Sequence, residues 1–190
     1  VRCGYLIVAP EGERADALRA SLAAQRAQGI EANEIDAGMA KALLPLADYG
    51  DAALIGHEPE AGFADAYLVT TGFARAARRL GATLLEGTTV TGLLRDGDRV
   101  TGVRTDQGDF SAGCVISAQN IWTSELAEWI GLPLPLRRER HAVMTLACDA
   151  HYTNAMPVFK DLASPGMLYC RSYGGQQMLV SEGLAGEAMD

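Results

Sequence analysis

The segment between residues 81 and 117 constrains the fold of this chain more than any other. A helical pattern ends at Gly81, a stretch that reads as a short strand covers 83–86, and Asp96-Gly97 then separates two further stretches that read as strands. An Asp-Gly pair in this setting is the strongest short-range signal for a tight hairpin. The apolar run 114–117 is typical of a buried parallel strand. The segment therefore predicts a helix, a strand, an antiparallel meander and a buried strand, in that order.

Helices and strands alternate before this segment, and strands dominate after it. The periodicity and capping residues predict four helices, over 11–28, 36–44, 65–80 and 121–130. Asp36 and Asp65 are the expected N-caps of the second and third helix, and the third carries an apolar stripe of Val69, Phe73, Ala76 and Leu80. Strands are expected over 4–9, 52–56, 138–148, 157–161, 167–171 and 177–181. This order predicts an α+β fold with an antiparallel or mixed sheet.

The charge of the chain favours a small-molecule partner over a nucleic acid. Its 24 acidic and 16 basic residues give a formal net charge of -8, whereas nucleic-acid binders usually carry a basic face. No apolar stretch approaches the roughly 20 residues that span a bilayer, and the first residues do not form a signal peptide. We therefore expect a cytoplasmic protein without a membrane span.

The cysteines and histidines do not predict a metal site. The four cysteines are far apart and each lies in a stretch that reads as a strand, so we expect buried thiols; they are Cys3, Cys114, Cys148 and Cys170. The three histidines have no metal-ligand spacing, and no Ser/His/Asp order or nucleophile elbow supports a hydrolase.

Several short stretches, taken in order, resemble one enzyme family. They are CGYLI at 3–7, EAGFAD at 60–65, LGAT at 80–83, GTTV at 87–90, VTGV at 100–103, CVISA at 114–118, PVFKD at 157–161 and MLYCR at 167–171. In this order they resemble the D-amino-acid oxidase, glycine oxidase and sarcosine oxidase family of flavoproteins. The last two stretches are most similar to its sarcosine oxidase and dimethylglycine dehydrogenase branch.

The resemblance implies two structural neighbourhoods. It assigns residues 1–80 and 121–190 to a substrate domain built on an antiparallel or mixed sheet with helices. It assigns 81–120, with parallel strands and the β-meander, to part of a Rossmann-type FAD domain. A dinucleotide site needs a GxGxxG turn, which this chain lacks. We therefore expect that segment before Val1 and a further segment after Asp190, and we expect the chain alone to be inactive and to hold no FAD.

The resemblance also points to residues near the cofactor. Val90, beside Thr89, matches a position whose backbone faces the adenine end of FAD, although a valine in a strand needs no such role. The turn after the predicted buried strand matches a flavin contact in the family and comprises Ala118, Gln119, Asn120 and Trp122. The family usually has Ala-Gly where this chain has Gln119-Asn120. Asparagine tolerates the left-handed conformation, so the turn is expected to persist.

Three residues are candidates for the substrate site. Tyr169 and Arg171 alternate along a predicted strand and therefore share one face. An arginine there can bind a carboxylate through two hydrogen bonds, and a tyrosine hydroxyl can orient an amine beside it. An ordinary arginine on an exposed sheet face is the structural alternative. His57 precedes the family's turn into the long helix and is a candidate to line the same cavity.

These observations predict an FAD-dependent oxidoreductase that acts on the C–N bond of a secondary amine or amino acid, of the sarcosine, dimethylglycine, glycine or D-amino-acid type. The expected partners are this small substrate and the rest of the protein's own chain. Two alternatives stay open. One is a non-catalytic binding module of the same fold, and the other is a related flavoprotein for a 2-hydroxy acid or glycerol phosphate.

Overall fold

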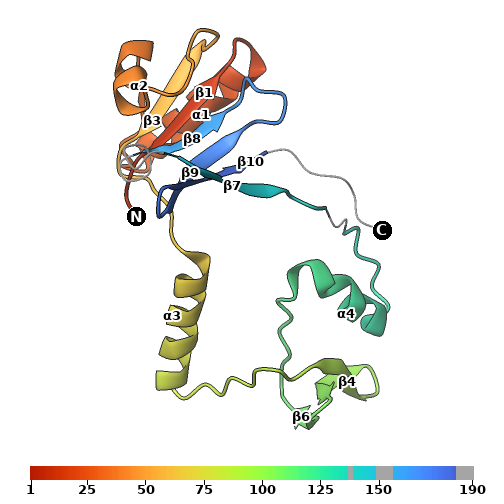
Figure 1. Cartoon of the computed structure of the whole chain (residues 1–190). Helices are drawn as coiled ribbons and strands as arrows, with labels where there is room; N and C mark the ends of the chain where they lie inside the picture. The colour runs from red at the N-terminus through yellow and green to blue at the C-terminus, as the bar shows by residue number, and fades with distance from the viewer. Residues whose placement is uncertain (137–138, 149–155, 183–190) are drawn as a thin grey trace. The chain divides into compact units, whose positions relative to one another are not determined.

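The chain forms two compact units in the computed structural model, which describes residues 1–136, 139–148 and 156–182 (Figure 1). The first unit draws on Val1–Asp65 and Arg140–Glu187, and the second on Ala66–Glu139. None of the described helices combines the length and the apolar character needed to cross a membrane.

A seven-stranded sheet forms the first unit. Its strands lie in the order β2-β3-β1-β8-β9-β10-β7. Their bounds are β1 Tyr5–Ala9, β2 Asn33–Glu34, β3 Leu54–Glu58, β7 Val143–Ala147, β8 Val158–Asp161, β9 Tyr169–Gly174 and β10 Gln177–Ser181. Among the described strands, β1 and β8 are the one parallel pair. The sheet is therefore mixed, which confirms the predicted α+β class.

The β1–β8 pair joins segments from the two ends of the chain. The Val158 amide donates to the Gly4 carbonyl at 2.9 Å, and the Leu162 amide donates to the Val8 carbonyl at 2.8 Å. Leu6 and Val158, on these two strands, have no exposed surface. Because both strands are central and buried, their pairing fixes the order of the other strands.

The main core lies on one face of the sheet and is covered by α2 (Ala37–Leu43) and the loop after it. Asp36 caps α2 by accepting a hydrogen bond from the Met39 amide at 2.8 Å, as predicted. The Tyr49 hydroxyl closes the other end, because it can donate to the Ala40 or the Leu44 carbonyl, at 3.2 and 3.0 Å. The buried residues of this core are Leu6, Val8, Ala40, Leu44, Tyr49, Ile55, Met156, Phe159 and Cys170.

The opposite face is covered in part by α1 (Glu13–Ala27). Leu18 and Leu22 of this helix pack with Ala9 and Leu54. A Cβ on Gly56 would lie only 3.2 Å from the Leu22 side chain, so a glycine allows the helix to approach β3 closely. The helix covers one end of this face, on β3, β1 and the end of β8, and the cluster it forms does not extend to β9 or β10.

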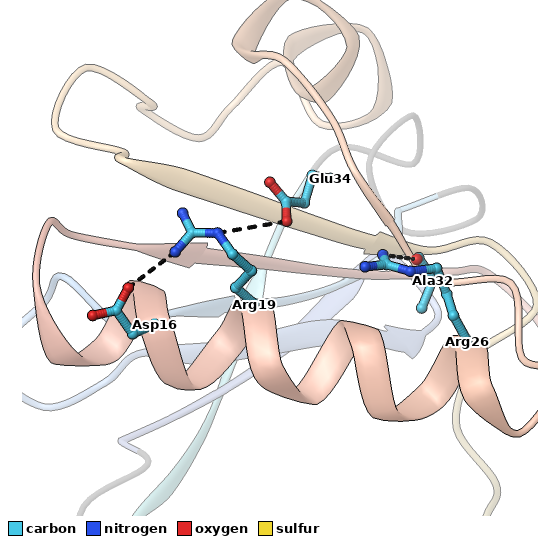
Figure 2. Close-up of polar contacts among 5 residues, drawn as sticks. All are labelled: Asp16, Arg19, Arg26, Ala32 and Glu34. Atoms are coloured by element: carbon cyan, nitrogen blue, oxygen red, sulfur yellow. Dashed lines mark hydrogen bonds and ion pairs between the residues drawn. The ribbon is translucent and has the colours of Figure 1, made fainter.

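Arginine side chains connect α1 to the segment that leads into β3 (Figure 2). Arg19 contacts Asp16 within the helix at 3.0 Å and Glu34 of β2 at 3.7 Å. Arg26 donates to the Ala32 carbonyl at 2.7 Å. The ion pairs are exposed and contribute little free energy, so the apolar contacts hold the helix and the arginines orient it.

The second unit contains a β-meander and two α-helices. Its elements are α3 Ala66–Arg79, β4 Val90–Asp96, β5 Arg99–Thr105, β6 Gly108–Ser111, η1 Asn120–Trp122 and α4 Thr123–Ile130. The strands form a separate antiparallel sheet in the order β4-β5-β6, which confirms the hairpin predicted at Asp96-Gly97. Arg95 donates to the Trp129 carbonyl at 2.6 Å and connects the meander to α4.

Two predicted strands in this unit are wrong. Neither 83–86 nor 114–117 is a strand, because no described segment pairs with either. Ile116 is 88% exposed, and on α3 the predicted apolar stripe is uncovered, with Leu80 89% exposed. An apolar run is a strand only where another strand accepts its hydrogen bonds. The prediction of four buried thiols is also wrong, because Cys114 is exposed and Cys3 and Cys148 are half-buried, leaving Cys170 as the buried one.

We expect the change Tyr49→Phe to lower the free energy of unfolding by about 1–2 kcal/mol, because the carbonyls at the end of α2 lose their donor. Burial, and to a smaller extent Cys170, raises the pKa of Tyr49 from 10.0 to about 12. The wild-type contribution is therefore full below pH 10 and is lost as the pH rises toward 12. Urea unfolding at pH 8 and pH 11 measures both effects. Tyr67→Phe on an exposed helix face is the control.

Candidate functional site

The sheet register places Tyr169 and Arg171 on the face that α1 covers only in part. Residues directly opposite one another on paired strands share a face. Ile7 pairs with Lys160, and Lys160 pairs with Tyr169. Arg171 lies two residues further along β9 and therefore shares this face, as predicted. Tyr5, two residues before Ile7, lies on the same face, which we call the substrate face after the role that the sequence predicts for Tyr169 and Arg171.

His57 lies on the other face of the sheet. It pairs with Leu6, which pairs with Phe159, and Phe159 pairs with Cys170. A Cβ on Gly4 would lie 3.2 Å from Nε2 of His57. The structure therefore does not bring His57 together with Tyr169 and Arg171. Burial lowers the pKa of His57, and the charge of Glu31 opposes this effect.

Arg171 lies against two aromatic rings. Its guanidinium carbon is 4.4 Å from the centre of the Phe63 ring and 5.6 Å from that of Tyr173. Its Nη1 donates to the Ser172 carbonyl at 2.9 Å. Contacts with ring faces leave other N–H groups at the edge of the guanidinium available as donors. No carboxylate in the described part of the chain forms an ion pair with Arg171.

A hollow of about 360 Å³ lies beside this arginine. The N-terminal residue, the loop before α3 and the end of β9 line it, with residues Val1, Phe63, Ala64, Asp65, Arg171, Ser172, Tyr173 and Gly174. Small-molecule sites are commonly hollows of this size, with apolar walls and a few polar groups. The substrate face thus combines a cation, two aromatic rings and a hollow.

Tyr5 adds a neutral hydroxyl to the substrate face. Burial, followed by the effect of nearby Tyr169, raises the pKa of Tyr5 above its ordinary 10.0. Tyr5 therefore keeps its proton throughout the physiological range and can donate a hydrogen bond. Two tyrosine hydroxyls and a guanidinium on one face can orient a small carboxylate.

The sequence prediction missed four residues of this face. Phe63, Tyr173, Tyr5 and Lys160 were not among the predicted site residues. Tyr173 could have been found, because it continues the alternation of Tyr169 and Arg171 along the same strand. Tyr5 and Lys160 lie on other strands, so only the pairing of β1, β8 and β9 brings them to this face, and Phe63 reaches it from the loop before α3.

In the second unit, Asn120 adopts the left-handed conformation, with a φ of 51°. It begins η1 and follows Ala118 and Gln119. The Thr123 hydroxyl donates to the Asn120 carbonyl at 2.7 Å and holds the turn. Trp122 is 56% exposed. The expected turn therefore exists, with asparagine where the family usually has glycine.

The backbone of Val90 points to an open sheet edge. Thr89 is tied to Asp106, because the Thr89 amide donates to Oδ1 of Asp106 and the Asp106 amide donates to the Thr89 carbonyl, each at 3.0 Å. Successive residues of a strand direct their backbone groups to opposite sides. The Val90 amide and carbonyl therefore point away from β5, at the free edge of β4. The Val90 amide can donate a hydrogen bond to the edge of a heterocycle, and the Val90 carbonyl can accept one from it.

The described residues contain no group of three or more histidine, cysteine, aspartate or glutamate side chains that could hold a metal ion.

A family comparison covers nearly all of the chain. The family described as "DAO: FAD dependent oxidoreductase" matches residues 1–187. The chain belongs to this family. Oxidation of amino acids and amines with FAD is thus the shared chemistry of its relatives, and FAD is the cofactor of the family.

Two relatives of known activity are about one-third identical to the chain. The 4-methylaminobutanoate oxidase (formaldehyde-forming) of Paenarthrobacter nicotinovorans is 34% identical over 161 residues, which are 85% of this chain and 20% of the relative. The sarcosine oxidase subunit beta of an Arthrobacter species is 33% identical over 131 residues, 66% of this chain and 32% of the relative. The chain thus spans a third or less of the length of either relative.

Solved structures of the family share the fold. The L-proline dehydrogenase of P. horikoshii superimposes with a TM-score of 0.89 at 24% identity, over 100% of this chain and 50% of that one. The glycine oxidase of Geobacillus kaustophilus superimposes with a TM-score of 0.76 at 21% identity, over 98% of this chain and 49% of that one. The chain corresponds to about half of each structure.

Because burial lowers the pKa of His57, the stability of the fold should depend on pH. We expect the imidazole of His57 to titrate below 6.5 in NMR spectra of the folded chain. As the pH falls, His57 takes up a proton at a higher pH in the unfolded state than in the folded state. The free energy of unfolding should therefore decrease as the pH drops through 6.5, and it should stop decreasing below the pKa of the folded state. The change His57→Gln should remove this step from the unfolding free energy. A midpoint at or above 6.5 would contradict the burial of His57.

Proposed function

We propose that this chain is the substrate-side part of a longer FAD-dependent enzyme that oxidises the C–N bond of a secondary amine or amino acid. The observation that carries the proposal is Arg171, held against Phe63 and Tyr173, with no carboxylate of the described residues in an ion pair with it. A partly buried guanidinium of this kind is suited to the carboxylate of an amino acid. Family membership supports the oxidative chemistry.

The residues of the substrate face would hold and orient the substrate. Arg171 binds the carboxylate with two parallel hydrogen bonds, and the hydroxyls of Tyr5 and Tyr169 direct the amine end. Phe63 and Tyr173 restrict the guanidinium to one plane and exclude water from one side. FAD, when bound, supplies the hydride acceptor for the carbon next to nitrogen. The chain's own contribution is therefore position and charge rather than acid-base chemistry.

The second unit would contact the cofactor at two places. We assign the adenine end to the free backbone edge at Val90, with Thr89 fixed beside it by Asp106. We assign the flavin ring to the left-handed turn at Asn120, with Ala118, Gln119 and Trp122 around it. Both places offer backbone groups rather than charged side chains, which suits the neutral rings of FAD.

Exposed apolar side chains favour a longer enzyme over a stand-alone binding module. Ile116, Phe73 and Leu80 are 75–89% exposed, and all three belong to predicted apolar faces. A self-contained module should cover such side chains. The solved relatives, twice as long as this chain, are consistent with further protein in the same molecule.

The full-length protein tests this function directly. We expect it to show the visible absorption of bound flavin and to lose this absorption without oxygen when its substrate is added. Sarcosine, dimethylglycine, glycine and D-amino acids are the compounds to add, with 2-hydroxy acids and glycerol phosphate as comparisons. A full-length protein that binds no flavin, or whose flavin no amine reduces, would exclude the proposal.

The change Arg171→Gln tests the carboxylate contact. Hydrogen bonds to charged groups contribute about 1.5–3 kcal/mol, so we expect the KM for the substrate to rise at least about tenfold. Arg19→Gln removes the same charge from the exposed side of α1 and should leave the KM unchanged. Stopped-flow reduction of the flavin measures both variants. Equal effects of the two changes would mean that Arg171 acts only through the overall charge.

A further inference from the structure

Lys160 is a second cation on the substrate face. It lies on β8 between Ile7 of β1 and Tyr169 of β9, to which it pairs. Its neighbours on the same face of β8 are Val158, which has no exposed surface, and Leu162, which packs against the α1 cluster. Lys160 therefore has apolar neighbours on its own strand, and its side chain is half-buried.

The two cations of this face lie close together. Arg171 is two residues along β9 from the partner of Lys160, and such diagonal neighbours are about 7–8 Å apart. Like charges at this separation repel, and the repulsion is relieved when an anion lies between them. Two cations side by side are unusual in this chain, because its formal net charge is -8.

No carboxylate of the described residues neutralises either cation. Lys160 forms no ion pair among the described residues, and neither does Arg171. Glu58 shares the face in the row of Tyr5 but forms no ion pair with Lys160 or Arg171. Asp161, next to Lys160 in sequence, alternates to the opposite face.

We propose that Lys160 binds a second acidic group of the substrate, so that the preferred substrate is an N-alkylated amino dicarboxylate. Arg171 holds one carboxylate and Lys160 the other, with the tyrosine hydroxyls between them. This inference rests on the proposed function and specifies its substrate class. Lysine suits the second position because its single flexible ammonium follows a carboxylate at different chain lengths, whereas the stacked arginine fixes the first.

Two substrates that differ in charge alone test the proposal. In the full-length flavoprotein, we expect N-methyl-DL-glutamate to be oxidised with a kcat/KM about tenfold or more above that of N-methyl-DL-glutamine. The change Lys160→Gln should abolish this preference through the KM for the glutamate, with little effect on the glutamine. Lys160→Arg should restore part of it. The chain has only one other lysine, so Lys41→Gln on α2 is the matched control and should keep the preference.

Each outcome decides one of the two proposals. If no amine reduces the flavin of the unchanged protein, the proposed function fails. If sarcosine reduces the flavin but the protein does not distinguish the glutamate from the glutamine, the function stands and the role of Lys160 is wrong. A preference that persists in Lys160→Gln also overturns that role. Competitive inhibition by glutarate, compared with butyrate, gives a binding readout independent of turnover and should weaken in the same variant.

Discussion

The parallel pairing of β1 with β8 is the constraint on which the first unit depends. It joins residues near the start of the chain to residues about 150 positions later, and it buries Leu6 and Val158 completely. Strands on either side then add in order, β3 and β2 next to β1, and β9, β10 and β7 next to β8. Because parallel strands cannot be connected by a tight turn, a long excursion must leave and return between them, and the second unit lies within it.

This pairing also decides the chemistry of each sheet face. The alternation of side chains sends Leu6, Phe159 and Cys170 into the core under α2, and His57 goes with them. The same alternation sends the cations and tyrosines to the other face, where α1 covers only one end. A shift of one residue in register would exchange the two sets. The apolar core therefore holds the polar face in register.

In the second unit, local sequence patterns predicted the hairpin correctly but not the two other strands. Its hairpin formed as predicted, because Asp96-Gly97 and the flanking strands carry all that a hairpin needs. The predicted strands at 83–86 and 114–117 did not form, since a strand needs a partner strand that local sequence does not supply. The left-handed turn at Asn120 formed nevertheless, because it depends on one residue's own conformational freedom.

The sequence by itself determined the family, the order of most elements, the caps and turns, and the shared face of Tyr169 and Arg171, because each of these depends on neighbours a few residues away. Tertiary structure alone decided that His57 lies on the opposite face, that Phe63 stacks on Arg171, and that Lys160 joins the same face. The relations of His57 and Phe63 to Arg171 join segments more than 100 residues apart. The faces on which His57 and Lys160 lie follow from strand register, which a single sequence does not encode locally, whereas Phe63 reaches Arg171 from the loop before α3.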